Sequence, residues 1–197
     1  LSSSSAASDV YKRQLLEKIA TDEIENRVRY IAVSKLTNQA LLAKLALEDK
    51  DNYLRMHCLR KLTDQDLLTR IAYEDKDLMV REDAAKTLID QALLTKIAVD
   101  KNAQDVVRRA TFNKLVDQAP LAKIALQGEN NFVRCAAADA LTDQTFLAEI
   151  AMNEKLSYDI RRPALRKLLD QVLLSKIAGD GKESYDVRRD AIESLTD

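Results

Sequence analysis

The chain contains few of the residues that interrupt helices. Its 197 residues include three glycines, two prolines and no tryptophan, and aromatic residues make up 5%. Closely packed short helices need few such residues, whereas sheets and their turns need more of them. Apolar residues still make up 46% of the chain, which is ample material for a core. We therefore expect an all-α fold.

The chain also has no excess of either charge and no long apolar run. It carries 31 basic and 32 acidic residues, so no net field attracts it to nucleic acid or anionic lipid. No run reaches the length of a membrane span, and the N-terminus lacks the apolar stretch of a signal peptide. We expect a cytoplasmic protein with no membrane partner.

One sequence unit occurs seven times along the chain. An arginine recurs at steps of 26, 26, 27, 26, 27 and 27 residues, and these seven residues, the arginine column, are Arg29, Arg55, Arg81, Arg108, Arg134, Arg161 and Arg188. A period between 20 and 50 residues indicates a stacked array and not a single globular core. We predict an α-solenoid (superhelix) of seven two-helix repeats of 26–27 residues. Its two cysteines, Cys58 and Cys135, lie three repeats apart, so we expect both to be reduced.

Residues 64–88 show how one copy folds. Asp64 is a good N-cap for a first helix of about nine residues, which places Leu68 and Ile71 on one apolar face. Asp77 can cap a second helix of about eleven residues, whose apolar side chains recur with helical spacing from Val80. Helices this short are marginal alone, so stability must come from stacking copy on copy.

Both ends of the chain depart from the repeat. Residues 1–14 are rich in serine and alanine and resemble translated adapter sequence, so we expect this N-terminal tail to be disordered or a sequencing or cloning artefact. The array then covers residues 15–197. It stops at Asp197, the position that opens the next copy, so we expect a C-terminal truncation that leaves Val187, Ala191, Ile192 and Leu195 uncovered and prone to self-association.

The unit resembles HEAT-like repeats. The likeness rests on the segment from Asp75 to Arg81 and on its echoes through Val187-Arg188, over roughly residues 15–197. The short period is similar to that of phycobilin-lyase-type HEAT proteins and approaches that of the leucine-rich-repeat variant. The resemblance implies an interaction scaffold whose second helices line the concave face. It also leaves two alternatives open, a DNA-binding array and a HEAT-type lyase.

Positions that recur in every copy are expected to hold the array together. The arginine column lies at the inward edge of the second helix, so we expect each arginine to be at least half buried and to bond carboxylates, such as Asp49 or Asp75, or backbone carbonyls of its own or the next copy. Replacing Arg81 by Met should then destabilise the array by a few kcal/mol. A glutamine column is expected to form a second ladder: Gln39, Gln65, Gln91, Gln118, Gln144 and Gln171.

Positions that differ between copies are free to select a ligand. They lie one and five residues after each arginine of the column, and together we call them the second-helix surface. Arginine and aromatic side chains are frequent interface anchors. The expected binding residues for a protein or peptide partner are Tyr30, Met56, Arg60, Arg109, Asn113, Arg162, Arg166 and Arg189.

Catalytic chemistry finds little support in the sequence. The single histidine, His57, precedes Cys58, and neighbours on a helix point 100° apart and cannot form a nucleophile–base pair. No glycine-rich phosphate loop and no metal-spaced cysteine and histidine set occurs. We therefore expect a non-enzymatic protein without cofactor or metal.

Overall fold

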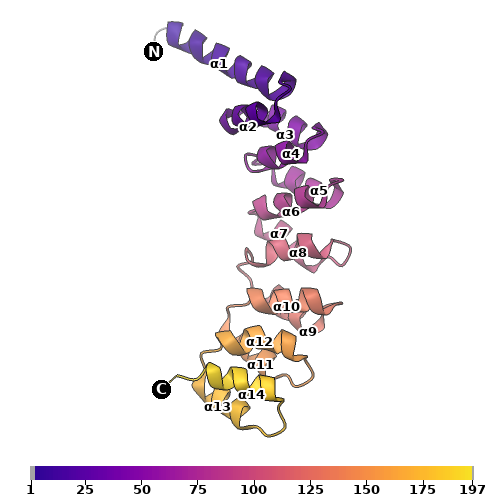
Figure 1. Cartoon of the computed structure of the whole chain (residues 1–197), viewed down its shortest axis with the longest axis vertical. Helices are drawn as coiled ribbons and strands as arrows, with labels where there is room; N and C mark the ends of the chain where they lie inside the picture. Colours follow the sequence, from indigo (N-terminus) through magenta and orange to yellow (C-terminus); the bar gives the residue numbers. More distant parts are fainter. Residues whose placement is uncertain (1–2, 197) are drawn as a thin grey trace. The chain divides into compact units, whose positions relative to one another are not determined.

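The computed structural model describes residues 3–196, and throughout this range the regular elements are α-helices (Figure 1). The helices form seven consecutive pairs. The first helices of the pairs are α1 (Ser3–Asp22), α3 (Gln39–Glu48), α5 (Gln65–Glu74), α7 (Gln91–Val99), α9 (Ala119–Gln127), α11 (Gln144–Met152) and α13 (Gln171–Gly179). The second helices are α2 (Asn26–Lys35), α4 (Asn52–Leu59), α6 (Leu78–Thr87), α8 (Asp105–Phe112), α10 (Asn131–Ala140), α12 (Tyr158–Lys167) and α14 (Tyr185–Glu193). The predicted all-α, two-helix solenoid repeat is confirmed.

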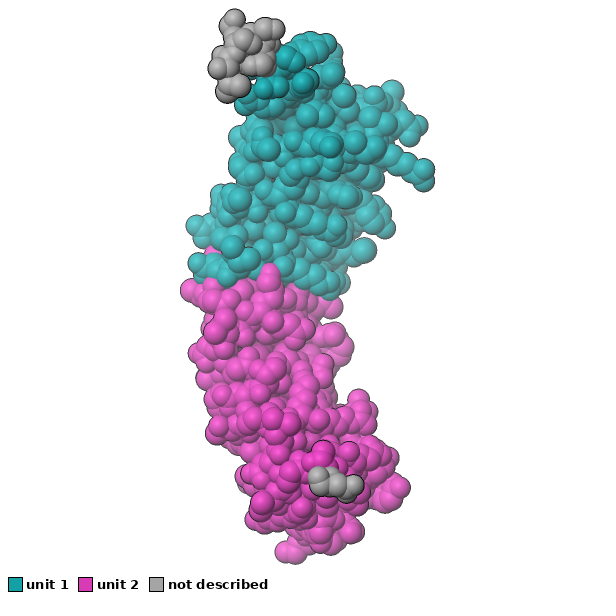
Figure 2. All heavy atoms as spheres, turned by 90° about the vertical axis from the view of Figure 1, so that its left-hand side faces the viewer, with its two compact units in different colours: residues 1–90 teal, residues 91–197 magenta. Residues whose placement is uncertain are grey.

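The chain divides into two compact units, residues 1–90 and 91–197 (Figure 2). Within each unit the two helices of a pair pack on one another, and the pairs stack in sequence order. Consecutive second helices lie closer together than consecutive first helices in both units. Each unit is therefore shorter along its second helices than along its first helices.

Side-chain caps explain where the helices begin. Asp64 accepts a hydrogen bond from Leu67 N, and Asp77 accepts from Met79 N and Val80 N, so both predicted caps are confirmed. Such a bond satisfies one of the free amides of the first turn and contributes about 1 kcal/mol. Glu25, Gln104 and Ser157 stand at the N-cap positions of α2, α8 and α12 but make no side-chain cap bond.

The core consists of the recurring apolar positions. In the copy formed by α5 and α6, Leu68, Ile71 and Ala72 are buried from the first helix, as are Val80 and Ala84 from the second. Complete burial of one leucine contributes roughly 2 kcal/mol, and this contribution recurs in every copy. The spacing of apolar residues alone was therefore sufficient to identify the core.

The second helices are shorter than predicted, with eight to ten residues. The leucine that ends the apolar pattern usually lies just past the helix in an extended conformation: Leu88 is the C-cap of α6, and Leu141 is that of α10. Pro163 lies inside α12, which nevertheless begins at Tyr158, directly after Ser157.

The ends of the described chain follow the same packing. Helix α1 runs through Ser3–Asp22, and the side chains from Ser8 to Gln14 are exposed. In the last pair Val187 and Ala191 are buried because α14 packs against α12 and α13, so the prediction that they are uncovered is wrong. Ile192 remains 56% exposed.

Candidate partner-binding surface

The glutamine column joins the two ends of each copy from the second to the seventh. The Gln39 side chain donates to Lys61 O and accepts from Thr63 N, and the Gln65 carbonyl accepts from Ile89 N at 2.8 Å and Asp90 N at 3.1 Å. The same side-chain oxygen accepts from a backbone N–H in the later copies, from Val116, Thr142, Leu169 and Thr196. The predicted glutamine ladder is confirmed, and each rung joins the start of a first helix to the segment that follows the second helix of the same copy.

The arginine column is bonded throughout. Arg55 is 1% exposed and forms a bidentate pair with Asp75, with N–O distances of 2.8 and 3.0 Å, while its third nitrogen donates to Asp49 O. Comparable ion pairs to the following copy join Arg29 to Asp49, Arg108 to Glu129 and Arg161 to Glu183. Since the bonds reach carboxylates and helix C-terminal carbonyls, the prediction of a structural inter-repeat ladder is confirmed.

Three arginines of the column form hydrogen bonds but no ion pair among the described residues. Arg81 donates to Asp75 O, Arg134 donates to Ala125 O and Leu126 O, and Arg188 donates to Ala178 O. The reason given for Arg81→Met, the loss of a partner from a buried acid, is therefore wrong, and Arg55 is the appropriate position for that test.

The sequence explains the missing ion pair of Arg134. The copy that follows Arg134 in unit 2 carries Leu156 five residues before its own arginine, whereas Glu129 and Glu183 occupy that position in the copies that follow Arg108 and Arg161. Leucine cannot accept a hydrogen bond through its side chain.

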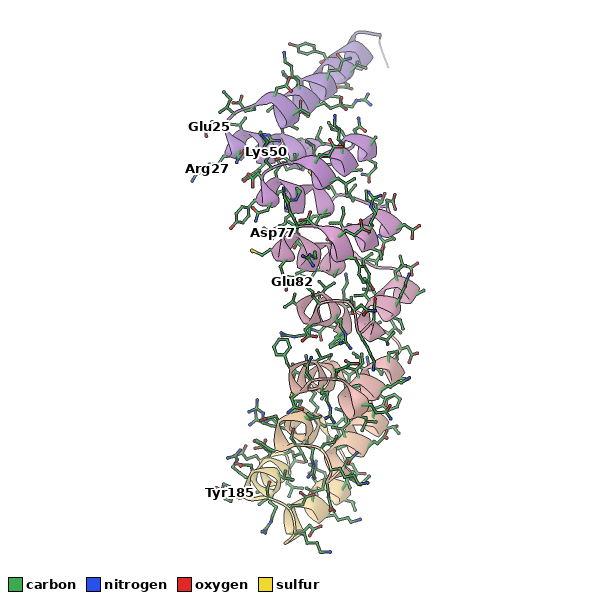
Figure 3. The ribbon with its side chains drawn as sticks, turned by 90° about the vertical axis from the view of Figure 1, so that its right-hand side faces the viewer. Glu25, Arg27, Lys50, Asp77, Glu82 and Tyr185 are labelled. Carbon is green, nitrogen blue, oxygen red and sulfur yellow. The ribbon has the colours of Figure 1, made fainter. Side chains whose placement is uncertain are left out.

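On the second-helix surface of unit 1, Tyr30 is held by its neighbours. Its hydroxyl donates to Asp51, and its ring stacks on His57 with centroids 5.0 Å apart. Burial, and then the bond to Asp51, raise the pKa of Tyr30 to about 12, so the phenol stays protonated. Met56 is half-buried on the adjacent helix. The third copy carries an ion pair of 2.6 Å between Glu82 and Lys86, and Glu82 lies at the outer edge of α6 (Figure 3).

Two of the expected anchor arginines also pair with the following second helix. Arg60 lies 3.2 Å from Asp83, and Arg166 lies 3.4 Å from Asp190. Both arginines are more than half exposed, with side-chain exposures of 57% and 52%. They can reach a partner, but their charge is already balanced within the array.

Arg189 belongs to a polar cluster around Asp190, whose side chain is fully buried. Asp190 accepts from Tyr158 at 2.9 Å and from Arg189 at 3.0 Å, while Arg189 also donates to the Tyr158 hydroxyl. Burial opposes ionisation of this carboxyl, but the hydrogen bonds from Arg189 and Tyr158 outweigh it and lower its pKa. Tyr185, on the same helix, is 77% exposed and points outward (Figure 3).

Arg109 and Arg162 differ from these arginines. Both are exposed, and neither forms an ion pair or a hydrogen bond with any described residue. The guanidinium of Arg109 lies over the ring of Phe132 at 4.3 Å from its centroid, and Phe132 is 52% exposed. Asn113, also expected to bind, is exposed at the end of α8.

Sequence reasoning missed Phe132, Tyr158 and Asp190. All three lie outside the two positions used to define the second-helix surface. The sequence did contain a signal for the ion pairs of Arg60 and Arg166. An aspartate lies two residues after the column arginine only in the copies that contain Asp83 and Asp190, and each of those copies follows one with Arg60 or Arg166. The co-occurrence of opposite charges in neighbouring copies therefore marked these two pairs.

The thiols and acids of the described chain show no arrangement typical of an enzyme. Both cysteines are free, as predicted; burial raises the pKa of Cys58 to about 12 and also raises that of Cys135, which is opposite to the shift that activates a thiol. Within residues 3–196 no group of three potential metal ligands gathers, and no helix there is both long and apolar enough to cross a bilayer. Every buried side-chain nitrogen or oxygen in that range has a partner.

Depressions on the units are shallow. One of about 250 Å³ in unit 2 lies beside Lys101, Lys123 and Glu129, and one of about 400 Å³ lies along α14 beside Tyr185 and Ile192. The first helices carry a mostly basic column that is exposed in every copy, as is typical of a solvated face. Its members are Lys18, Lys44, Arg70, Lys96, Lys123, Glu149 and Lys176.

The fold defines the class of the protein as an α-solenoid of two-helix repeats. The chain matches no protein-family model, no curated protein and no solved structure.

Proposed function

We propose that the chain is a HEAT-like interaction scaffold that binds a protein or peptide through the second-helix surface. The observation that carries this proposal is the division between recurring and variable side chains. The recurring arginine and glutamine columns are engaged in bonds within the array, whereas the variable positions after each arginine include exposed residues that form no ion pair or hydrogen bond with any described residue, such as Arg109 and Arg162.

The packing of the helices supports the choice of this face. Consecutive second helices make more close contacts with one another than consecutive first helices do within each unit, and we infer from this that the second helices line the concave side. Stacked repeats commonly bind extended ligands along such a side. The absence of net charge, and the acids Asp139, Asp159 and Glu193 on the same helices, favour a protein partner over DNA.

The test is a selection of peptides from a random displayed library on the whole chain, followed by affinity measurements with variants. Met56→Ala and Asn113→Ala change the second-helix surface, while Lys44→Ala and Lys176→Ala change exposed positions of the first helices. We expect the second-helix variants to weaken selected peptides by about fivefold or more, and the first-helix variants to leave binding unchanged. Binding lost only in the first-helix variants, or no selectable peptide at all, would overturn the proposal.

A further inference from the structure

Unit 2 displays positive charge that the array does not neutralise. Arg60 and Arg166 lie five residues after an arginine of the column, Arg189 lies one residue after, and each of the three has a carboxylate within 3.4 Å. Arg109 and Arg162 have none among the described residues. Since neighbouring arginines do find acids in the array, the absence is particular to these two sites.

The surroundings of Arg109 prepare it to bind a carboxylate. Stacking on Phe132 uses the flat face of the guanidinium and leaves its five N–H donors at the edge free. A forked pair with a carboxylate uses that edge. The half-exposed ring of Phe132 also offers apolar surface beside the charge, so the site combines an anion contact with an apolar contact.

The acids nearby select the kind of anion. Asp139, whose side chain is 76% exposed, lies on α10, and the exposed Asp159 lies on α12, so acidic and basic side chains alternate along the surface. A continuous phosphate backbone would meet both repulsion and attraction there. A peptide with separate carboxylates can place each one on an arginine and avoid the acids.

We propose that unit 2 binds an acidic peptide segment, whose carboxylates contact Arg109 and Arg162 and whose apolar side chain packs on Phe132. This inference rests on the proposed function and adds the chemistry of the partner.

The stacking order also sets the spacing of the two carboxylates. Helix α10 packs between α8 and α12, and packed helices are about 8–10 Å apart, so the two arginines are on the order of 16–20 Å apart along the surface. An extended peptide advances about 3.3 Å per residue and covers this distance in roughly five or six residues.

The probe is a fluorescein-labelled peptide with two glutamates separated by five positions, serine and glycine between them, and a leucine beside the first glutamate. Its affinity for the whole chain is measured by fluorescence anisotropy, next to the same peptide with both glutamates replaced by glutamine and to labelled oligothymidine. We expect the glutamate peptide to bind at least about tenfold tighter than the glutamine peptide, and its affinity to fall with added salt.

Variants locate the site. Arg109→Gln and Arg162→Gln should each weaken the glutamate peptide by about tenfold, because each removes a charged hydrogen-bond donor. Arg70→Gln is the matched control, since it removes an exposed arginine of a first helix, outside the second-helix surface, and it should leave the affinity unchanged. All three side chains are exposed, and circular dichroism checks that the variants keep the helical content of the parent chain.

Each contrary outcome has its own meaning. If peptides selected from the library bind the second-helix surface while the glutamate peptide binds no better than its glutamine version, the acidic partner is wrong and the scaffold proposal stands. If no peptide of either kind binds, both are wrong. If oligothymidine binds more tightly than the glutamate peptide and depends on Arg109 and Arg162, the partner is nucleic acid and the inference is overturned.

Discussion

The two units build the same repeat but expose different chemistry on their second helices. Unit 1 presents Tyr30, Met56 and the ring of His57, together with the ion pairs of Arg60 and Lys86. Unit 2 presents Arg109 and Arg162, which form no ion pair with a described residue. The columns that hold the array are common to both units, so the difference shows that internal packing and surface chemistry are carried by separate positions of the repeat.

The units also differ in how many arginines of the column form ion pairs. Both unit 1 arginines that have a following copy in the same unit, Arg29 and Arg55, bond an aspartate of that copy. In unit 2, Arg108 and Arg161 bond glutamates, while Arg134 bonds only carbonyls. An ion pair this deep matters most when one partner is removed, because the remaining charge is then buried alone.

The largest expected effect tests that difference. Arg55→Met strips the bidentate partner from Asp75 and should destabilise unit 1 by about 3–5 kcal/mol. Arg134→Met leaves only carbonyls without a donor and should destabilise unit 2 by about 1–2 kcal/mol. Urea unfolding followed by circular dichroism, with amide exchange to locate the change, gives both values. Equal losses would mean that the carboxylate contributes nothing beyond the carbonyls.

The glutamine column should show no such difference between the units. Gln65→Ala and Gln91→Ala each remove a clasp made of two hydrogen bonds, and each should lower the free energy of unfolding by about 1–2 kcal/mol. Lys44→Ala, at an exposed first-helix position, is the control and should change it by less than about 0.5 kcal/mol. A loss in only one unit would contradict the view that the clasp is a common element.

A pH titration tests how much the ionised Glu129 of unit 2 contributes to stability. Hydrogen bonds from its own backbone N–H and from Lys101, with a contribution from Arg108, lower the pKa of Glu129 from 4.5 to about 2. A carboxyl with a lowered folded-state pKa stabilises the fold above its unfolded pKa, and that stabilisation is lost as the pH falls through the folded value. Between pH 4.5 and 2 the parent chain should therefore lose stability that Glu129→Gln lacks at every pH. Parallel unfolding curves for the two proteins over this range would contradict it.

The smallest effect concerns the thiols, one in each unit. Burial raises the pKa of Cys58 to about 12, and Cys58 has no exposed surface, while Cys135 is partly exposed. A disulfide reagent at pH 8 should modify Cys135 first and Cys58 only as unit 1 opens. Mass spectrometry of the digested protein identifies the order, and faster modification of Cys58 would mean that α4 opens readily.

Period and apolar spacing were sufficient to predict the fold, the core and both structural columns, because every copy repeats the same evidence. What could not be predicted was the partner of each arginine, since the acid has no fixed position in the repeat. Asp49 and Asp75 lie six residues before an arginine of the column, Glu129 and Glu183 lie five residues before one, and Leu156 replaces the acid in another copy. The contact between Arg109 and Phe132 was also missed, because it joins two copies through a position that no repeat pattern marks.

The glutamine clasp has a consequence for how such a chain can change its length. The clasp spans 24 residues for Gln39, Gln65 and Gln118, and 25 residues for Gln91, Gln144 and Gln171. The extra residue lies in the linker between the two helices, so the clasp closes on the equivalent amide in either case. Each copy is thus fastened to itself before it meets its neighbour. A gene duplication or exchange with its boundary between the clasped amide and the next first helix would move one complete copy with its clasp intact. Arrays of this kind could therefore gain or reorder copies during evolution without changes to their buried contacts.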